Sequence, residues 1–362
     1  MLINFKPFLL IFTLSLAACG GADDNNSKVP SQPTAQHTFK PQGLNGLIID
    51  RIYQQQDKIL ALSDDGLYQQ QPNDEWKLLG FRGLQTFDLA FINDQHWLLS
   101  LVKAHTNGVQ EYQMHETFDA GQNWVQVQRP FGENGQAEGV YAMRYDELSQ
   151  QLFATGINVL AVSTNHGISW QKLAGNWAEF AQPKWALGID PRSKDVWWGG
   201  QGPIEDGVLN VYRTELKQNE SFRDLIPNPA AYTNVRFAAS TAGHSLIYAC
   251  GEDGILLSSD LGKTWRNLIA NADKRFYFDV LFDTEHNNRL YTSSWTKRFT
   301  EGQPLILEWS DNQGASWQKQ TYEPNAAFFG GVRSLAFVRK QNQSYLYLGL
   351  WKGGVMQVTI NR

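Results

Sequence analysis

The chain of 362 residues has only two cysteines, Cys19 and Cys250. Cys19 falls in an N-terminal segment that we predict to lie outside the folded domain, so this domain has no pair of thiols for a disulfide. Its stability must therefore come from apolar burial. Cys250 lies in the apolar run 246–250 and is expected to be a small buried residue. A catalytic thiol is not predicted, because no partner histidine is evident.

Sequence patterns that hold metals or phosphates are absent as well. The seven histidines show neither HxH nor HExxH spacing. The run Gly199-Gly200-Gln201-Gly202 lacks a following Lys-Ser/Thr, so we expect a turn and not a phosphate loop. A calcium site needs several convergent oxygens, which single aspartates in separate turns do not provide. We therefore predict no metal and no cofactor.

The chain also has no excess of positive charge and no long apolar segment. Its 31 Lys and Arg residues are outnumbered by 36 Asp and Glu residues, for a formal net charge of -5. This acidic balance argues against nucleic acid as the main partner. The apolar run 8–18 is too short to span a bilayer as a mature helix.

That apolar run belongs to a targeting segment and not to the fold. It ends in Leu16-Ala17-Ala18-Cys19-Gly20. These residues resemble a bacterial lipobox, which implies cleavage after residue 18 and lipidation of Cys19. Gly20 instead of Asp after the cysteine implies, by the same resemblance, the outer membrane. The alternative is an ordinary cleaved signal peptide with an incidental cysteine.

Residues 19–37 are rich in Gly, Asp, Asn, Ser, Pro and Gln and are predicted to form a flexible tether. A tether of this length would hold a domain roughly 25 Å from a bilayer. The chain is therefore divided into a signal peptide (1–18), a lipidated cysteine with its linker (19–37) and one folded domain (38–362). The expected location is the bacterial cell envelope, with the protein anchored by lipid in the outer membrane and the domain in the periplasm or at the surface.

The most informative feature of the sequence is an eight-residue motif that recurs along the folded domain. Its copies are 117–124, 163–170, 258–265 and 310–317, the last with a slightly shifted spacing, and a weaker trace is 63–66 with Trp76 further on. An Asp or Asn in each copy can accept hydrogen bonds from nearby amides, a Gly supplies positive φ, and a Trp buries its ring. We expect each copy to fasten a β-hairpin. The residues predicted to have this structural role are Asp119, Gly121, Trp124, Asn165, Gly167, Trp170, Asp260, Gly262, Trp265, Asp311, Gly314 and Trp317.

This motif resembles the Asp-box, or BNR repeat, S-x-D-x-G-x-x-W, which implies a β-propeller and leaves the function open. Candidate innermost strands recur at 47–53, 87–92, 140–145, 185–190, 235–240, 276–282 and 332–338. We therefore predict an all-β fold, a single propeller of seven four-stranded blades. The fourth unit keeps its strands but lacks the box. The last unit has three strands, so residues near 37–40 are expected to supply the fourth and close the ring.

In this arrangement all the boxes join third to fourth strands and so lie on one face. The opposite face consists of loops that lead into the first strands and turns that join second to third strands, and loops on a rigid scaffold are where function concentrates. Basic and aromatic residues recur at these positions and are the candidates for a binding face: Arg82, Lys184, Trp185, Arg236, Arg275, Trp295, Lys297, Arg333, Trp351 and Lys352. The alternative is that the tryptophans pack between blades and the cations are a solvated rim.

The chain resembles the YVTN/BNR-like group of propellers over about residues 44–360, including those related to photosystem II assembly factors. That resemblance implies a non-enzymatic scaffold. We expect a monomeric envelope protein that binds a protein or peptide partner and is attached to the membrane through its lipid.

A glycoside hydrolase is the alternative, because sialidases and some glucan hydrolases also carry Asp-boxes. A sialidase needs three convergent arginines for a carboxylate, and Arg236, Arg275 and Arg333 are the candidates. The Arg-Ile-Pro-like motif of such enzymes is absent before the first box, and Gln128-Arg129-Pro130 follows it. A hydrolytic carboxylate pair would have to come from Asp88, Glu179, Asp279 and Glu323. Xyloglucanase-like enzymes use two propellers, and this chain has room for one.

Overall fold

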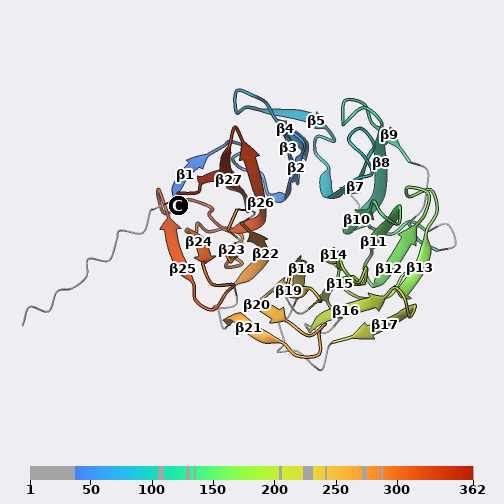
Figure 1. Cartoon of the computed structure of the whole chain (residues 1–362). Coiled ribbons are helices and arrows are strands. Elements are labelled where there is room, and N and C mark those ends of the chain that lie inside the picture. The colour runs from blue at the N-terminus through green and yellow to red at the C-terminus, as the bar shows by residue number, and fades with distance from the viewer. Residues whose placement is uncertain are drawn as a thin grey trace, which may run out of the picture. The chain divides into compact units, whose positions relative to one another are not determined.

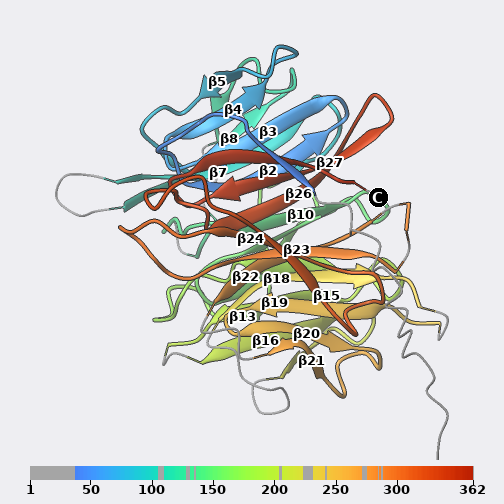
Figure 2. The same ribbon diagram turned by 90° about the vertical axis from the view of Figure 1, so that its left-hand side faces the viewer.

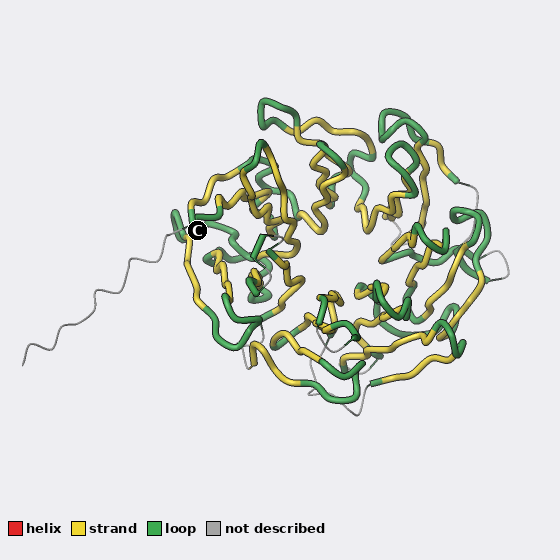
Figure 3. Tube along the Cα trace, in the orientation of Figure 1, coloured by secondary structure: helices red, strands yellow, loops and turns green. Residues whose placement is uncertain are grey.

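The computed structural model describes residues 37–361 except 105–109, 128–130, 134–135, 204–205, 223–230, 241–242, 271–274, 284 and 287. The described part consists of strands and loops (Figure 3). No helix in these ranges is long and apolar enough to cross a membrane. The predicted signal peptide, Cys19 and almost all of the linker lie outside the described residues, as does Gln128-Arg129-Pro130.

The described strands form seven antiparallel four-stranded sheets, as predicted, arranged as the blades of a ring (Figure 1). The first blade contains β2 (Ile49–Gln55), β3 (Lys58–Ser63), β4 (Gly66–Gln70) and β5 (Trp76–Gly80). The second contains β6 (Gln85–Phe91), β7 (Trp97–Ala104), β8 (Gln110–Thr117) and β9 (Val125–Gln126). The third contains β10 (Ala142–Asp146), β11 (Gln151–Thr155), β12 (Val159–Ser163) and β13 (Gln171–Gly175).

The remaining blades repeat this order from the ring axis outwards. The fourth contains β14 (Ala186–Ile189), β15 (Val196–Gln201), β16 (Gly207–Arg213) and β17 (Gln218–Ser221). The fifth contains β18 (Tyr232–Ala238), β19 (Leu246–Gly251), β20 (Gly254–Ser258) and β21 (Arg266–Ala270). The sixth contains β22 (Phe276–Phe282), β23 (Leu290–Trp295), β24 (Leu305–Ser310) and β25 (Gln318–Tyr322). The seventh contains β26 (Val332–Lys340), β27 (Gln343–Leu350), β28 (Gly354–Thr359) and β1 (Thr38–Pro41).

The ring closes without a covalent link, through strand β1. This strand pairs with β28 in the register Thr38↔Thr359 to Pro41↔Met356, which confirms the predicted source of the missing fourth strand. His37 secures the junction, since Gln320 on β25 both accepts from its backbone N–H (2.8 Å) and donates to its carbonyl (2.9 Å). The closure therefore couples the first residues of the ring to both the sixth and the seventh blades.

The core lies between neighbouring blades, because each sheet is covered on both faces. Leu60 and Leu62 of β3, for example, pack in one cluster with Leu99 and Leu101 of β7 in the next blade. This arrangement explains why middle strands such as β12 and β20 are buried along their whole length and do not alternate between apolar and polar residues. Cys250 is fully buried in such a cluster, and burial raises the pKa of its thiol well above the usual value. The predicted structural role of this cysteine is confirmed.

The four box hairpins join third to fourth strands in the second, third, fifth and sixth blades, as predicted. In each, a hydroxyl at the first position accepts the N–H of the box glycine, as Ser258 does from Gly262 (2.8 Å). The tryptophan indoles of three boxes donate to backbone carbonyls, as Trp265 does to Gly262 (2.9 Å). Trp170 packs edge-on against Phe131, and its buried indole N–H has no acceptor among the described residues.

The sixth-blade box requires a correction. Asn312, and not Asp311, occupies the fastening position: its side-chain oxygen accepts from the Ser316 N–H (2.8 Å) and the Ser310 hydroxyl (2.9 Å). Asp311 instead pairs with Arg289 outside the turn. The spacing of this copy is therefore regular, with Asn in place of Asp.

The trace at 63–66 also lies elsewhere than the boxes. It forms the turn between β3 and β4, where the Ser63 hydroxyl donates to the Gly66 carbonyl (2.9 Å). A turn from second to third strand lies on the face opposite the boxes, so this trace is not a fifth box. Seen from the side of the ring, the strands run between these two faces (Figure 2).

Candidate functional site

Charged residues on the first strands surround the ring axis as ion pairs that join neighbouring blades. The Arg333 Nε on β26 donates to Asp50 on β2 (2.7 Å). The Arg236 Nε and Nη2 on β18 donate to the two carboxylate oxygens of Asp279 on β22 (2.8 and 2.6 Å). Both carboxylate side chains are largely buried, and a buried charge is tolerated only when it is paired and hydrogen-bonded. These pairs therefore join the seventh blade to the first and the fifth to the sixth. A third pair, between Asp88 on β6 and Arg144 on β10, joins the second blade to the third.

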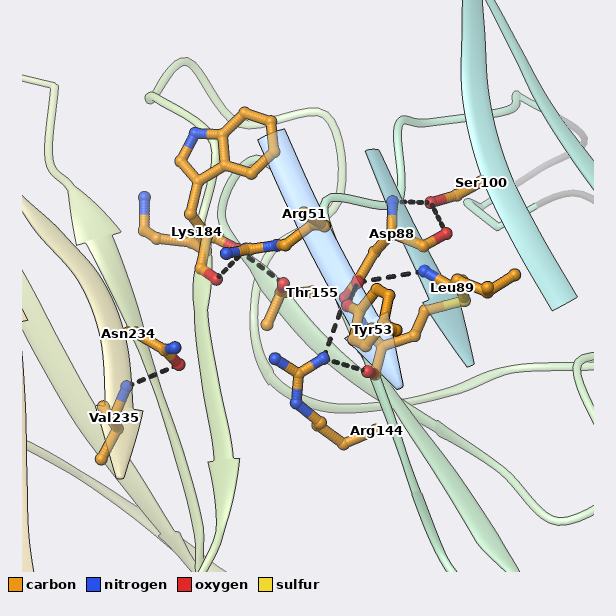
Figure 4. A network of polar contacts seen from close by, with 12 residues as sticks. Arg51, Tyr53, Asp88, Leu89, Ser100, Arg144, Thr155, Lys184, Asn234 and Val235 are labelled. Carbon is orange, nitrogen blue, oxygen red and sulfur yellow. Dashed lines mark hydrogen bonds and ion pairs between the residues drawn. The ribbon is translucent and has the colours of Figure 1, made fainter. Parts of the chain in front are cut away.

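Asp88 on β6 is the most completely satisfied of these carboxylates. It is fully buried and accepts hydrogen bonds from the Arg144 Nη1 (3.0 Å), the Met143 N–H (2.7 Å), the Leu89 N–H (3.0 Å) and the Tyr53 hydroxyl (Figure 4). Burial outweighs every other influence on the Tyr53 hydroxyl and raises its pKa. Tyr53 is therefore a neutral donor at any physiological pH.

Arg51 has no carboxylate partner among the described residues, unlike the other three axial arginines. Its Nη2 donates to the carbonyl of Trp185 (3.3 Å), the residue that precedes β14 of the fourth blade. A small cavity of about 40 Å³ opens here, at the beginning of the first strands and thus on the face opposite the boxes. Its lining consists of Asp50, Arg51, Trp185, Thr233, Phe278 and Arg333.

Beside this cavity, aromatic side chains of the sixth and seventh blades form a cluster, which we call the aromatic platform. Its members are Phe276, Phe278, Trp295, Phe299 and Trp351. Trp295 and Trp351 stack with their ring centroids 5.0 Å apart and their planes at 27°. The Arg333 guanidinium lies 4.8 Å from the Phe278 centroid and 5.4 Å from each tryptophan ring, a favourable cation–π geometry. Phe299 is 53% exposed, although it is a large apolar side chain.

A second aromatic group lies between the second and fourth blades. Phe87, Tyr141 and Trp185 contact one another at centroid distances of 4.9 to 5.7 Å. Trp185 also lines the small axial cavity, together with Phe278 of the aromatic platform. The predicted aromatic residues are therefore gathered around the axis on the face opposite the boxes.

The predicted cations do not form one surface. Lys184 is fully buried, and its ammonium group donates to the carbonyls of Ile157, Gln182 and Gln201 at 2.8 to 2.9 Å. It therefore holds loops together and is not available to a partner, which corrects its place among the binding-face candidates. Arg236 also departs from the prediction: it lines a cavity on the box-bearing face.

The remaining cations are on the expected face and are engaged with neighbouring groups. Lys297 pairs with Glu252 and lies 4.6 Å from the Phe276 ring, and Lys352 donates to the Phe299 carbonyl (3.0 Å). Arg275 is mostly buried beside Glu308, at 3.8 Å. Arg82 is the most exposed of the set, with its side chain 69% accessible and 3.5 Å from Asp65.

The residues considered for sugar hydrolysis are not assembled as a catalytic pair. Asp88 and Asp279 are each neutralised by an arginine from a neighbouring blade. Glu179 accepts hydrogen bonds from Asn176 and Asn158, which lower its pKa, and Glu323 is exposed after β25.

Three other carboxyls have the raised pKa expected of a general acid, but they lie in different blades. Burial raises the pKa of Glu308 on β24, of Glu138, which precedes β10, and of Asp64 in the turn between β3 and β4. The three candidate arginines for a sialidase are likewise held apart by different acids: Asp279, Glu308 and Asp50. Within the described ranges, no group of three or more His, Cys, Asp or Glu side chains could hold a metal ion.

The sequence prediction missed Asp50, Arg51 and Arg144, and it missed Phe278 and Phe299 of the aromatic platform. A signal for the axial residues was present, because a charged residue inside an otherwise apolar first strand has to be paired when it is buried. Phe299 gave no such signal, since a phenylalanine in a loop is usually covered.

No known protein family and no curated protein matches the sequence. Solved structures match in fold. The GH74 xyloglucanase from Xanthomonas campestris is similar over 88% of this chain and 53% of its own length, with a TM-score of 0.63 and 13% identity. An ancestral GH74 enzyme is similar over 90% of this chain and 46% of its own length, with a TM-score of 0.58 and 12% identity. The chain thus spans about half the length of these enzymes, and the likeness is one of propeller fold.

Proposed function

We propose that this protein is a non-enzymatic scaffold that binds a protein or peptide partner through the aromatic platform, on the face opposite the boxes. The observation that carries this proposal is the half-exposed Phe299, packed at the edge of the Trp295–Trp351 stack with Arg333 against both rings. Tryptophan, tyrosine and arginine in a packed, rigid setting are the usual anchors of protein interfaces. Because the rings are already held by one another, a partner would not have to order them.

The geometry favours binding over catalysis. A glycoside hydrolase needs two carboxyl groups about 5–10 Å apart, one of them with a raised pKa. Around the axis Asp50, Asp88 and Asp279 are instead each paired with an arginine from a neighbouring blade. These groups act as structural ion pairs.

We further propose that Cys19 is lipidated and that the partner is an envelope protein or peptide. The motif Leu16-Ala17-Ala18-Cys19-Gly20 supports this anchor, and the polar composition of 19–37 supports a tether that leaves the ring free to meet a partner. The lipid would then attach the protein to the membrane, and the aromatic platform would bind the partner. A monomer is sufficient for both.

The test is an affinity capture from detergent-solubilised envelopes of the source bacterium, analysed by mass spectrometry. Phe299→Glu places a charge on the platform, and Phe118→Glu is its control, because Phe118 is 59% exposed on the box-bearing face. We expect wild type and Phe118→Glu to capture the same partner and Phe299→Glu to lose it at least tenfold. A partner that all three proteins retain equally would overturn the proposal.

A glycoside hydrolase, sialidase-like or glucan-active, is the second candidate, and the fold shared with the two GH74 enzymes is what favours it. Incubation of the protein with xyloglucan, other β-glucans and sialosides, followed by measurement of released sugars, tests it. We expect no release above that of the heat-inactivated protein. Release that Asp88→Asn or Glu308→Gln abolishes in a folded protein would establish an enzyme.

A further inference from the structure

The ring axis has a second and larger opening, on the box-bearing face. A cavity of about 440 Å³ lies where the first strands of the third to sixth blades end. Its lining includes Asp146, Pro191 and Lys194, which lie at or beyond the ends of β10 and β14, in the hairpins to the second strands. The box-bearing face, for which the sequence predicted only a structural role, therefore also contains a cavity of the size that small ligands occupy.

One end of this cavity is lined by Arg144 and Arg236, whose charges are paired with Asp88 and Asp279 but which retain unused hydrogen-bond donors. Arg236 uses its Nε and Nη2 for Asp279, and no residue among those described accepts from its Nη1. The Arg144 Nη1 donates to both Asp88 and the Met143 carbonyl. Its Nε and Nη2 have no acceptor among the residues that the structure describes. The ion pairs fix both guanidinium groups in position before any ligand arrives.

The walls of the cavity are apolar. Leu187, Ile189, Val235, Phe237 and Phe282 contribute to them from three first strands. Gly188 makes this wall compact, because a Cβ there would lie 2.7 Å from the Phe237 ring and 2.9 Å from the Val235 carbonyl. The first strands of the fourth and fifth blades can therefore approach each other closely only with glycine at this position.

We infer that this box-side cavity binds an organic carboxylate that carries an aromatic or branched aliphatic body. A planar guanidinium presents paired N–H donors that match the two oxygens of a carboxylate. The apolar walls would bury the body of the same molecule, and the available volume falls within the range of small-ligand sites. Such a carboxylate is supplied either by a free small acid or by the C-terminus of a peptide that ends in an apolar residue.

Isothermal titration of the full chain with matched probes tests the chemistry without any mutation. The probes are 3-phenylpropionate, its neutral amide and acetate, which lacks the apolar body. The peptide arm compares Gly-Gly-Phe with its C-terminal amide. We expect 3-phenylpropionate to bind at least tenfold more tightly than its amide and than acetate. Tighter binding of Gly-Gly-Phe than of 3-phenylpropionate would identify a peptide C-terminus as the source, and the reverse would identify a free acid.

Two variants locate the site. Arg236→Gln with Asp279→Asn replaces the ion pair by an amide pair, so that no unpaired charge remains, and Ile189→Glu places an anion in the apolar wall. Ile168→Glu is the control, since Ile168 is 52% exposed in a box hairpin. We expect the first two variants to bind 3-phenylpropionate at least tenfold more weakly and the control to bind as wild type does. Equal binding of acid and amide, wild-type binding by both site variants, or no saturable binding of any probe would overturn the inference. Because the platform lies on the other face, none of these outcomes bears on the proposed function.

Discussion

Each box hairpin is held by the side chains of its first and third positions, and its backbone needs two successive residues with positive φ. In the fifth blade these residues are Leu261 (φ 64°) and Gly262 (φ 91°). Glycine adopts this conformation without cost, whereas leucine does not. The hydrogen bonds of Ser258 and Asp260 to the backbone must therefore offset the strain at Leu261. The geometry shared by the four hairpins of this chain thus depends on side chains and not on glycine alone.

The sixth-blade box offers a direct test of which residue fastens the turn. Asn312→Ala removes the acceptor of the Ser316 N–H and the Ser310 hydroxyl, and we expect it to lower the free energy of unfolding by about 1–2 kcal/mol. Asp311→Ala removes a half-exposed ion pair with Arg289 and an exposed hydrogen bond from the Gln318 amide, for which we expect less than about 1 kcal/mol. Urea unfolding of both variants measures the difference. A larger loss of unfolding free energy from Asp311→Ala than from Asn312→Ala would show that Asp311 stabilises the turn.

The burial of Lys184 could not be predicted from its neighbours in the sequence. A lysine before Trp185 in a connecting loop is usually solvated, and its sequence neighbours give no other indication. Its acceptors are carbonyls of residues 157, 182 and 201, which only the folded ring brings together. Buried ammonium groups need such complete sets of acceptors, and no local pattern reveals them.

At the scale of elements, the first strands could be predicted well because each is a short apolar run bounded by turn residues. The predicted beginnings of all seven lie within three residues of the observed ones. Strand β1 could be predicted as well, since a seventh blade with three strands leaves an edge that some other segment has to cover. The trace at 63–66 was misplaced because a Ser-Asp-Asp-Gly turn fits either kind of hairpin, and the distance to Trp76 was the only sign against a box.

The closure by β1 depends on His37, which makes the ring sensitive to acid. The His37 imidazole is buried, with its ring centroid 4.7 Å from that of Trp309, and its Nδ1 accepts from the Asn361 N–H (3.3 Å). Burial is the main cause that lowers the pKa of this imidazole from its usual 6.5. Below pH 6.5 the unfolded chain therefore binds more protons than the folded one, and stability is lost as the pH falls.

We therefore expect the Tm of the wild type to fall more steeply between pH 7.5 and pH 5 than that of His37→Gln. His286→Gln, which replaces an exposed histidine, should retain the wild-type dependence. Differential scanning calorimetry across this pH range measures both. A slope that His37→Gln leaves unchanged would show that other groups control the acid sensitivity.

At the scale of the whole molecule, the axial ion pairs join residues that are remote in sequence. Arg333 and Asp50, for example, are 283 positions apart. The propeller repeat predicts that their strands are neighbours, but which charges meet depends on the β-bulges in the first strands, where the pairing register shifts. For this reason the sequence could predict that aromatic residues gather on the face opposite the boxes, but it could not predict which arginine pairs with which carboxylate.

Loss of an axial arginine should therefore destabilise the ring far more than loss of a surface arginine. Arg333→Met leaves the buried Asp50 without its cation, and we expect a loss of about 3–5 kcal/mol. Arg82→Met removes a cation whose side chain is 69% exposed, and the expected loss is below about 1 kcal/mol. Urea unfolding at low and high salt compares them. Similar losses from both would show that the axial pairs contribute little to the cohesion of the blades.

The pairing of Thr38 with Thr359 has a practical consequence. Both residues lie at the ends of their strands nearest the boxes, so the ring begins and finishes on that face. A biosensor chip joined directly to either of these two residues through a short link would therefore hold the molecule from the box-bearing face. Immobilised in this way, the protein presents Phe299 and its neighbours to the solution, whereas the box-side cavity faces the support. Each of the two surfaces thus has its own suitable assay, surface capture for the platform and free solution for the cavity.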